Sequence, residues 1–207
     1  MGKVLAMRGA YVAAAILGLA GCANLSSVTG KKFVPVAAGQ GVAIEVVQSP
    51  QVGLEVVIPS RDVSAVLLPA GRNGTVTTWR SQDNVTVAED RGVVVATRGL
   101  GDDLMAADAG PTLAALSGSR TGAYRRTFRF LDAEEHARYV LMGCTISRIG
   151  PETLAGRDLI RHEETCKAHN FGVKNIYWTD EARAVRAARQ WISPKVGMIA
   201  IGLSNAR

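Results

Sequence analysis

The sequence lacks an apolar run long enough to cross a membrane as a helix, which would need about 20 residues. Its N-terminal apolar stretch follows Lys3 and Arg8, holds about a dozen residues and stops before Asn24. A basic start, a short apolar centre and small residues before a cleavage site are typical of a secretory signal. We therefore expect residues 1–21 to direct export and to be removed.

A concentrated charge of either sign is also missing. The formal net charge is +6 at pH 7, and the basic residues are spread along the chain. Nucleic-acid binding needs a basic stripe and conflicts with export, so we exclude it. The hydrophobic fraction of 47% is normal for a folded domain with a core, and the Val- and Ile-rich runs argue against disorder.

Several catalytic motifs are absent as well. No Gly-x-Ser-x-Gly nucleophile turn occurs. The segment beginning at His162 would need a second histidine where Cys166 stands to form a helical zinc site, and Gly99-Leu100-Gly101 lacks the third glycine of a dinucleotide loop. Adjacent carboxylates could serve general acid and base chemistry on a glycan, although such pairs are usually capping or solvated residues; they stand at 102–103, 134–135 and 163–164. We therefore expect that the protein is not an enzyme and that it binds no cofactor or metal.

The residues that end the predicted signal, Leu19-Ala20-Gly21-Cys22, resemble a bacterial lipobox. The resemblance implies cleavage before Cys22, a diacylglycerol on its sulfur and acylation of its new amino group. Each buried methylene contributes ~0.8 kcal/mol, so two or three acyl chains anchor a protein stably. Ala23 stands where aspartate marks inner-membrane retention in Gram-negative lipoproteins, which implies outer-membrane sorting facing the periplasm. A plain signal with an accidental cysteine is the alternative.

Cysteine is scarce, with three in the chain. Lipidation of Cys22 would leave Cys144 and Cys166 as a pair in an oxidising compartment, where disulfides persist. A bridge between them would close a loop of ~20 residues and contribute roughly 3 kcal/mol in the chain-entropy model. Free buried thiols are the alternative. We favour the disulfide.

The rest of the chain divides into a tether and a β-rich region. Residues 22–41 are small and polar and indicate the lipidated N-terminus with its tether, and residues 42–207 form the predicted domain. Residues 99–107 resemble a helix start, and 181–190 could form either a helix or a strand. Predicted strands cover residues 42–47, 54–58, 63–68, 75–80, 85–87, 93–97, 124–131, 137–147, 153–166, 173–178, 184–192 and 196–203. This pattern predicts a mainly β, antiparallel barrel-like or sandwich domain with one or two short helices.

One predicted strand carries alternating side chains with two interpretations. Tyr124, Arg126, Phe128 and Phe130 share one face, and Arg125, Thr127 and Arg129 share the other. The first interpretation is a core-facing row backed by a solvated row. The second is a basic ladder for an anionic polymer such as an acidic polysaccharide. We favour the first.

Four motifs of the chain are specific enough to compare with a known family. The most specific is Ala-Thr-Arg-Gly-Leu-Gly-Asp-Asp-Leu at 96–104. The others are Trp79-Arg80-Ser81, Asn175-Ile176-Tyr177-Trp178 and Arg189-Gln190-Trp191-Ile192-Ser193-Pro194. Together they resemble the YjbF/GfcB lipoproteins of capsule and exopolysaccharide operons in Gram-negative bacteria. The resemblance spans about residues 79–194 and implies a mainly antiparallel β-barrel-like fold, with a family cysteine pair at Cys144 and Cys166.

The resemblance also implies a function. It indicates a non-enzymatic outer-membrane lipoprotein that assists polysaccharide secretion or assembly, together with an outer-membrane β-barrel protein, a periplasmic component and the polysaccharide itself. The family pattern holds no catalytic residues. Gly99, Leu100, Asp102 and Asp103 are candidates for a shaped loop with a structural or partner-binding role. A periplasmic glycan-processing enzyme and a generic envelope scaffold that binds only protein are the alternatives.

Overall fold

A computed structural model describes residues 53–131 and 136–203 of the chain. The predicted signal, Cys22, the tether and the predicted strand at 42–47 lie outside these residues. Within the described part, no helix is both long enough and apolar enough to span a bilayer.

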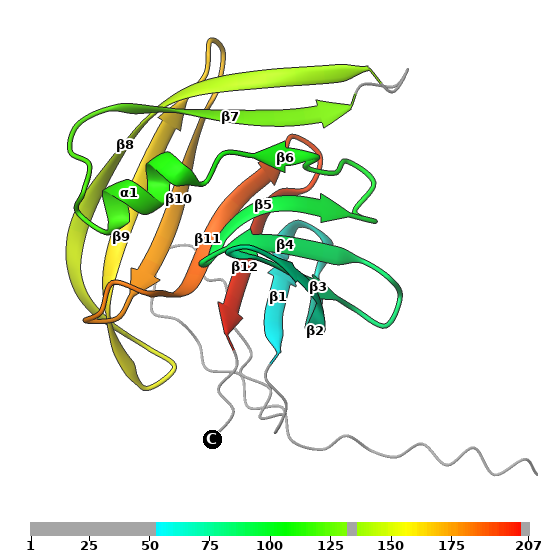
Figure 1. Ribbon diagram of the computed structural model, residues 1–207, viewed down its shortest axis with the longest axis horizontal. Coiled ribbons are helices and arrows are strands. Elements are labelled where there is room, and N and C mark those ends of the chain that lie inside the picture. Colours follow the sequence, from blue (N-terminus) through cyan, green and yellow to red (C-terminus); the bar gives the residue numbers. More distant parts are fainter. Residues whose placement is uncertain (1–52, 132–135, 204–207) are drawn as a thin grey trace, which may run out of the picture. The chain divides into compact units, whose positions relative to one another are not determined.

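Strands dominate the described residues (Figure 1). In chain order the elements are β1 (Leu54–Ile58), a 3-10 turn η1 (Pro59–Arg61), β2 (Val63–Asn73), β3 (Val76–Arg80), β4 (Thr86–Asp90), β5 (Val93–Arg98), β6 (Ala106–Ala107), α1 (Gly110–Leu116), β7 (Tyr124–Leu131), β8 (Ala137–Leu154), β9 (Arg157–Lys167), β10 (Gly172–Thr179), β11 (Val185–Ser193) and β12 (Gly197–Leu203). The β-branched and aromatic residues in these segments suit a pleated, half-buried surface.

The strands form one antiparallel sheet that nearly closes on itself. Its order is β5-β4-β3-β2-β1-β12-β11-β10-β9-β8-β7-β6, so the two ends of the described chain pair as β1 and β12. At the sheet's two edges, the backbone N–H of Thr97 in β5 donates to the carbonyl oxygen of Leu104, just before β6, at 2.8 Å. The predicted mainly β, barrel-like fold is confirmed. Closure of this kind leaves few exposed strand edges.

The main apolar core lies on the inner face of this curved sheet. Trp191 of β11 packs edge-on against Phe128 and Phe130 of β7, with ring centroids 5.5 and 5.7 Å apart. The helix α1 lies over the inner face of β8 to β10 and buries Thr112 and Leu116 (Figure 1). The helix therefore brings side chains of its own into the sheet's interior.

The long hairpin of β8 and β9 differs from the sequence prediction. We expected one strand at 137–147 and another at 153–166, but β8 continues through Gly150-Pro151 to Leu154. The sheet accommodates these residues with a register shift between Arg148 and Gly150, as expected for a bulge. The reversal falls at Ala155-Gly156, where φ is positive at both residues, as a tight two-residue hairpin turn requires.

The helix predicted to start within residues 99–107 was wrong in position. Residues 99–107 form a loop and the short strand β6, and α1 begins at Gly110 with Pro111 in its first turn. Proline suits that place because the N–H it lacks would have no helical partner there. The strand predicted at 184–192 is confirmed as β11, which pairs with β10 and β12. The alternative of a helix at 181–190 was wrong, because sheet pairing overrides the helix-friendly alanines and arginines of that segment.

Candidate functional site

A buried ion pair lies inside the sheet. Arg126 of β7 and Glu164 of β9 are 2% and 0% exposed, and Nη1 of the arginine lies 2.9 Å from Oε2 of the glutamate. Strand alternation points both side chains inward. Two charges this deeply buried are tolerated only when they are paired and hydrogen-bonded.

The Glu164 carboxylate also accepts four hydrogen bonds from neutral groups. The donors are the Thr112 hydroxyl at 2.6 Å, the Tyr124 hydroxyl at 2.8 Å, the Asn175 amide at 2.6 Å and the Tyr177 hydroxyl at 3.2 Å. These donors come from α1, β7 and β10. The carboxylate therefore ties the helix to three strands at one point.

Electrostatics keep this interior cluster in one protonation state. Burial alone would raise the pKa of Glu164, but the Arg126 guanidinium and the hydrogen bonds from Thr112 and Asn175 hold that pKa below its usual value. Burial and the neighbouring carboxylate raise the pKa of the Tyr124 and Tyr177 hydroxyls well above the ordinary tyrosine value. The hydroxyls therefore remain donors. Because both Glu164 oxygens are occupied, the cluster suits a structural clamp better than acid–base chemistry.

A second set of polar contacts extends the clamp across the interior. The Tyr177 hydroxyl oxygen lies 3.4 Å from Oε1 of Gln190, and Nε2 of Gln190 donates to the carbonyl oxygen of Gly92 at 3.0 Å. The backbone N–H of Val94 in β5 donates to the same Gln190 oxygen at 3.0 Å. These contacts connect β10 and β11 to the opposite wall of the sheet.

Cys144 and Cys166, the pair expected from the sequence, lie directly opposite each other on β8 and β9. The structure joins them in a disulfide, with Cα atoms 4.0 Å apart. Ligand atoms of both cysteines and Glu164 lie within 4.8 Å of one another. Sulfur atoms in a disulfide are not thiolates, however, so this trio lacks the ligands a zinc site needs.

The predicted loop residues Gly99, Leu100, Asp102 and Asp103 do lie together, between β5 and β6. The Asp103 carboxylate accepts the backbone N–H groups of Gly99 and Leu100 at 2.9 and 3.0 Å. The Asp102 carboxylate accepts the backbone N–H of Lys195, in the turn between β11 and β12, at 2.9 Å. Each of these contacts fixes backbone at the edge where the sheet closes, which suits a structural role.

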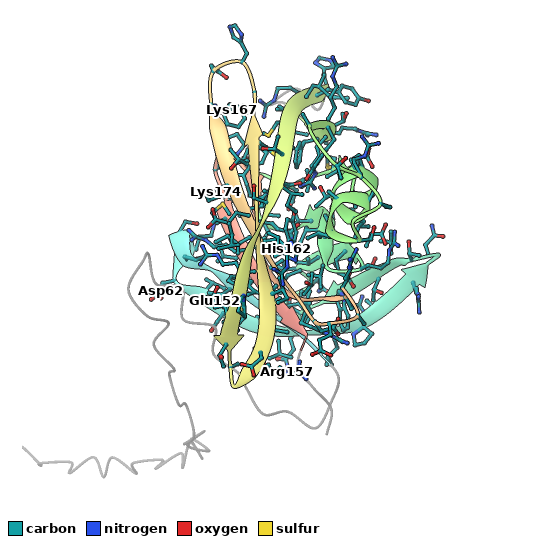
Figure 2. The ribbon with its side chains drawn as sticks, turned by 90° about the vertical axis from the view of Figure 1, so that its left-hand side faces the viewer. Asp62, Glu152, Arg157, His162, Lys167 and Lys174 are labelled. Carbon is teal, nitrogen blue, oxygen red and sulfur yellow. A yellow bond between two sulfur atoms is a disulfide. The ribbon has the colours of Figure 1, made fainter. Side chains whose placement is uncertain are left out.

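His162 lies apart from the disulfide, in an open cleft at the C-terminal end of α1. Figure 2 shows it on the side of β9 that faces α1, whereas Glu152 and Lys174 lie on the other side. Its Nε2 lies 3.1 Å from the Thr179 hydroxyl. The cleft has a volume of about 590 Å³ and is also lined by Arg120, Arg148 and Arg183. We call it the basic cleft.

The charges around the basic cleft act on His162. Burial, together with the nearby charges of Arg148 and Arg183, lowers the pKa of the imidazole below its usual value. The ring is therefore neutral at pH 7 and offers a hydrogen bond rather than a charge. Among the described residues, neither Arg120 nor Arg148 forms an ion pair.

Sequence reasoning found parts of these two sites. The predicted alternation of β7 is confirmed: Arg126 faces inward, and Arg125 and Arg129 are exposed. The role of Glu164 was missed, although a buried arginine requires an acidic partner and Glu164 shares a strand face with His162. The basic cleft was also missed, because Arg120, Arg148 and Arg183 lie far apart in the sequence.

Comparison with known proteins relates the chain to a fold and to a family. No curated protein matches the chain in sequence. The crystal structure of the hypothetical lipoprotein YmcC from Escherichia coli (K12) is similar, with a TM-score of 0.63 and 22% sequence identity over 76% of this chain and 85% of that one. This likeness shows a shared fold. A family model matches residues 37–203, beyond both ends of the motifs that carried the resemblance, and the chain therefore belongs to the YjbF family, the group 4 capsule polysaccharide lipoproteins GfcB and YjbF.

Proposed function

We propose that this protein is an outer-membrane lipoprotein, anchored through Cys22 and facing the periplasm, that assists secretion or assembly of a capsule or exopolysaccharide without catalysing a reaction. The observation that carries the proposal is the family match over residues 37–203. The lipobox-like residues Leu19–Cys22 and the neighbouring Ala23 support the anchor and its outer-membrane address.

The contacts of the candidate carboxylates support a non-enzymatic role. Asp102 and Asp103 hold loop backbone, and Glu164 is committed to the interior clamp. Glu163 pairs with Arg161 at 2.7 Å and with Lys174 at 2.9 Å. The remaining predicted pair, at 134–135, lies outside the described residues. Each of these four candidate carboxylates thus has a structural partner in place of a free position from which to act on a glycan.

One buried glutamate keeps the enzyme alternative worth testing. Burial raises the pKa of Glu89, which lines a second cleft of about 540 Å³ beside α1. A raised pKa in a cleft is a known sign of a general acid. Both Glu89 oxygens, however, already accept hydrogen bonds from Trp79 and Gly92, and none of the described residues lining that cleft adds the second carboxylate that glycoside hydrolysis requires.

Deletion of the gene tests the proposed process. We expect less polysaccharide at the cell surface, with recovery when the gene is restored. Unchanged surface polysaccharide would contradict the proposal. Incubating the purified protein with the polymer separates the accessory role from the enzyme, because we expect no new reducing ends, and their release would establish glycan cleavage.

The proposed partners are the other products of the same operon, in particular an outer-membrane β-barrel protein and a periplasmic component. Purification of the protein from cross-linked cells should recover them together with polysaccharide. Recovery of protein partners without polysaccharide would favour the generic scaffold.

A further inference from the structure

Three parts of the chain bring arginines into the basic cleft. Arg120 follows α1, Arg148 lies on β8 and Arg183 lies in the turn between β10 and β11. Gathering like charges in one concave space costs electrostatic energy that a bound anion would offset. Arg148 and Arg183 both lower the pKa of His162, so their positive charges act on the same volume.

The carboxylates of the cleft leave much of this positive charge uncompensated. Asp180 and Glu181 line the cleft beside the arginines. Asp180 is already paired with Arg186, whose Nη2 lies 2.5 Å from its carboxylate, and it also accepts the backbone N–H of Ala184. Glu181 is therefore the acidic group that remains to oppose the arginines.

Backbone geometry and a hydrogen bond fix the position of Arg183 in the basic cleft. Its backbone has a positive φ of 63°, and its N–H donates to the carbonyl oxygen of Asp180 at 2.9 Å. Its guanidinium donates to the carbonyl oxygen of Ser117 at the end of α1. Because a carbonyl oxygen is neutral, this bond holds the guanidinium in place without neutralising its charge. Arg183 and Leu116 line both the basic cleft and the second cleft beside α1, so the guanidinium lies where the two clefts meet.

The two clefts together make a surface suited to a chain-like molecule. The second cleft, which shares Leu116 and Arg183 with the basic cleft, is also lined by Arg91 and Arg186, which are already paired with Asp90 and Asp180. Arginine binds carboxylate, sulfate and phosphate groups through two parallel hydrogen bonds. Ile146 and Ile160 add an apolar lining to the basic cleft, and each cleft lies in the size range of ligand-binding sites.

We propose that the basic cleft binds an acidic segment of the polysaccharide, with Arg120 and Arg148 contacting its anionic groups and Arg183 guiding the chain past the end of α1. The choice of a glycan over an acidic peptide rests on the proposed function. The neutral His162 ring would add a hydrogen bond to the same segment.

Binding of defined oligosaccharides to the full-length protein in detergent tests the proposal. The probes are an oligogalacturonate, a neutral dextran oligomer of equal length and a poly-glutamate of equal charge. We expect oligogalacturonate to bind more tightly than either comparison, with an affinity that falls as salt screens the charges. Bound anions should also raise the pKa of His162, which NMR titration of its ring protons measures directly. Equal binding of dextran, or equal or tighter binding of poly-glutamate, would overturn the glycan assignment.

Matched variants locate the binding surface. Arg120→Gln and Arg148→Gln should each weaken oligogalacturonate binding roughly tenfold, as expected for the loss of a charge-assisted hydrogen bond. Combining the two gives the double variant Arg120→Gln/Arg148→Gln. Its control is Arg125→Gln/Arg129→Gln, which removes the same charge from the exposed face of β7. The control should bind within about twofold of the wild type, and all variants should keep the wild-type melting temperature.

Loss of binding in the β7 control rather than in the cleft variants would place the site on the exposed face of β7 and overturn the proposal. Absence of oligogalacturonate binding by the wild type would also overturn it. Deletion of the gene tests the proposed function, and its outcome does not depend on these binding results. A deletion strain with reduced surface polysaccharide that Arg120→Gln/Arg148→Gln fully restores would keep the proposed function and refute the cleft.

Discussion

At the scale of single residues, the interior clamp is built around charge rather than apolar packing. Arg126 and Glu164 each place a full charge where water is excluded, and four neutral donors complete the shell of the carboxylate. A buried pair of this kind adds little net stability over an apolar replacement, but it is costly to break on one side. Its value here is geometric, because its partners lie on α1, β7, β9 and β10.

Replacing Arg126 with methionine should therefore destabilise the fold by about 3–5 kcal/mol at pH 7, because Glu164 would remain buried and charged. Arg125→Met is the matched control on the exposed face of the same strand and should change stability by less than about 0.5 kcal/mol. Urea unfolding measures both. Equal losses for the two variants would contradict the account.

The pH dependence of that loss has a definite sign. In the wild type the folded-state pKa of Glu164 is lowered, so its stabilising contribution is present above the unfolded value near 4.5 and is lost as pH falls through the folded value. Without Arg126, burial raises the pKa of Glu164 instead. The difference in the free energy of unfolding between the wild type and Arg126→Met should thus become smaller from pH 7 toward pH 4.5. A difference that stays constant would show that the charge of Glu164 is not its cause.

Alternation along β7 was enough to predict that Arg126 faces inward. The partner could not be predicted in the same way, because β8 separates β7 from β9 and the contact depends on the registers of two strand pairs. Those registers include the shift between Arg148 and Gly150, which the sequence does not reveal.

At the scale of elements, the long hairpin of β8 and β9 supports both candidate sites. Its inner face carries Cys144, Cys166 and Glu164 near one another and carries Arg148 and His162 toward the basic cleft. The disulfide links the two strands between residues 22 positions apart. It therefore adds a covalent restraint beside the clamp.

Reduction of this disulfide should lower the free energy of unfolding by about 3 kcal/mol, since the reduced chain regains loop entropy when it unfolds. The Cys144→Ala/Cys166→Ala variant should show no further loss when reductant is added. Urea unfolding with and without dithiothreitol measures the difference, and peptide mapping of the oxidised protein should show the two cysteine peptides linked. Unlinked peptides would refute the bridge.

Most strands could be predicted because Val- and Thr-rich runs with alternating side chains are separated by turn residues, including glycines. The helix was misplaced because residues 99–107 contain aspartate, which can cap the start of a helix; the Asp103 carboxylate instead caps loop backbone at Gly99 and Leu100. Local sequence does not distinguish these uses of aspartate, since both satisfy free N–H groups. Closure of the sheet, where the backbone of Thr97 pairs with that of Leu104, determines that this segment forms a loop rather than a helix.

At the scale of the whole molecule, the described residues form a nearly closed β domain that carries the basic cleft, and the lipid anchor at Cys22 is our proposal. The chain belongs to a capsule polysaccharide lipoprotein family, and its described cleft arginines give that domain a place to meet an acidic polymer. Local patterns in the sequence predicted the barrel-like fold, which is confirmed, whereas the anchor at Cys22 stays a prediction. The cleft could not be predicted, because its residues meet only after α1 and the turn between β10 and β11 have packed together.

The most direct test of the central claim is the amount of surface polysaccharide in cells whose chromosomal gene carries Cys22→Ala, measured with the location of the protein in separated membranes. We predict that the variant leaves the outer-membrane fraction and that surface polysaccharide falls toward the level of the deletion strain. Normal surface polysaccharide with the protein absent from the outer membrane would contradict the claim that it acts there as an anchored factor.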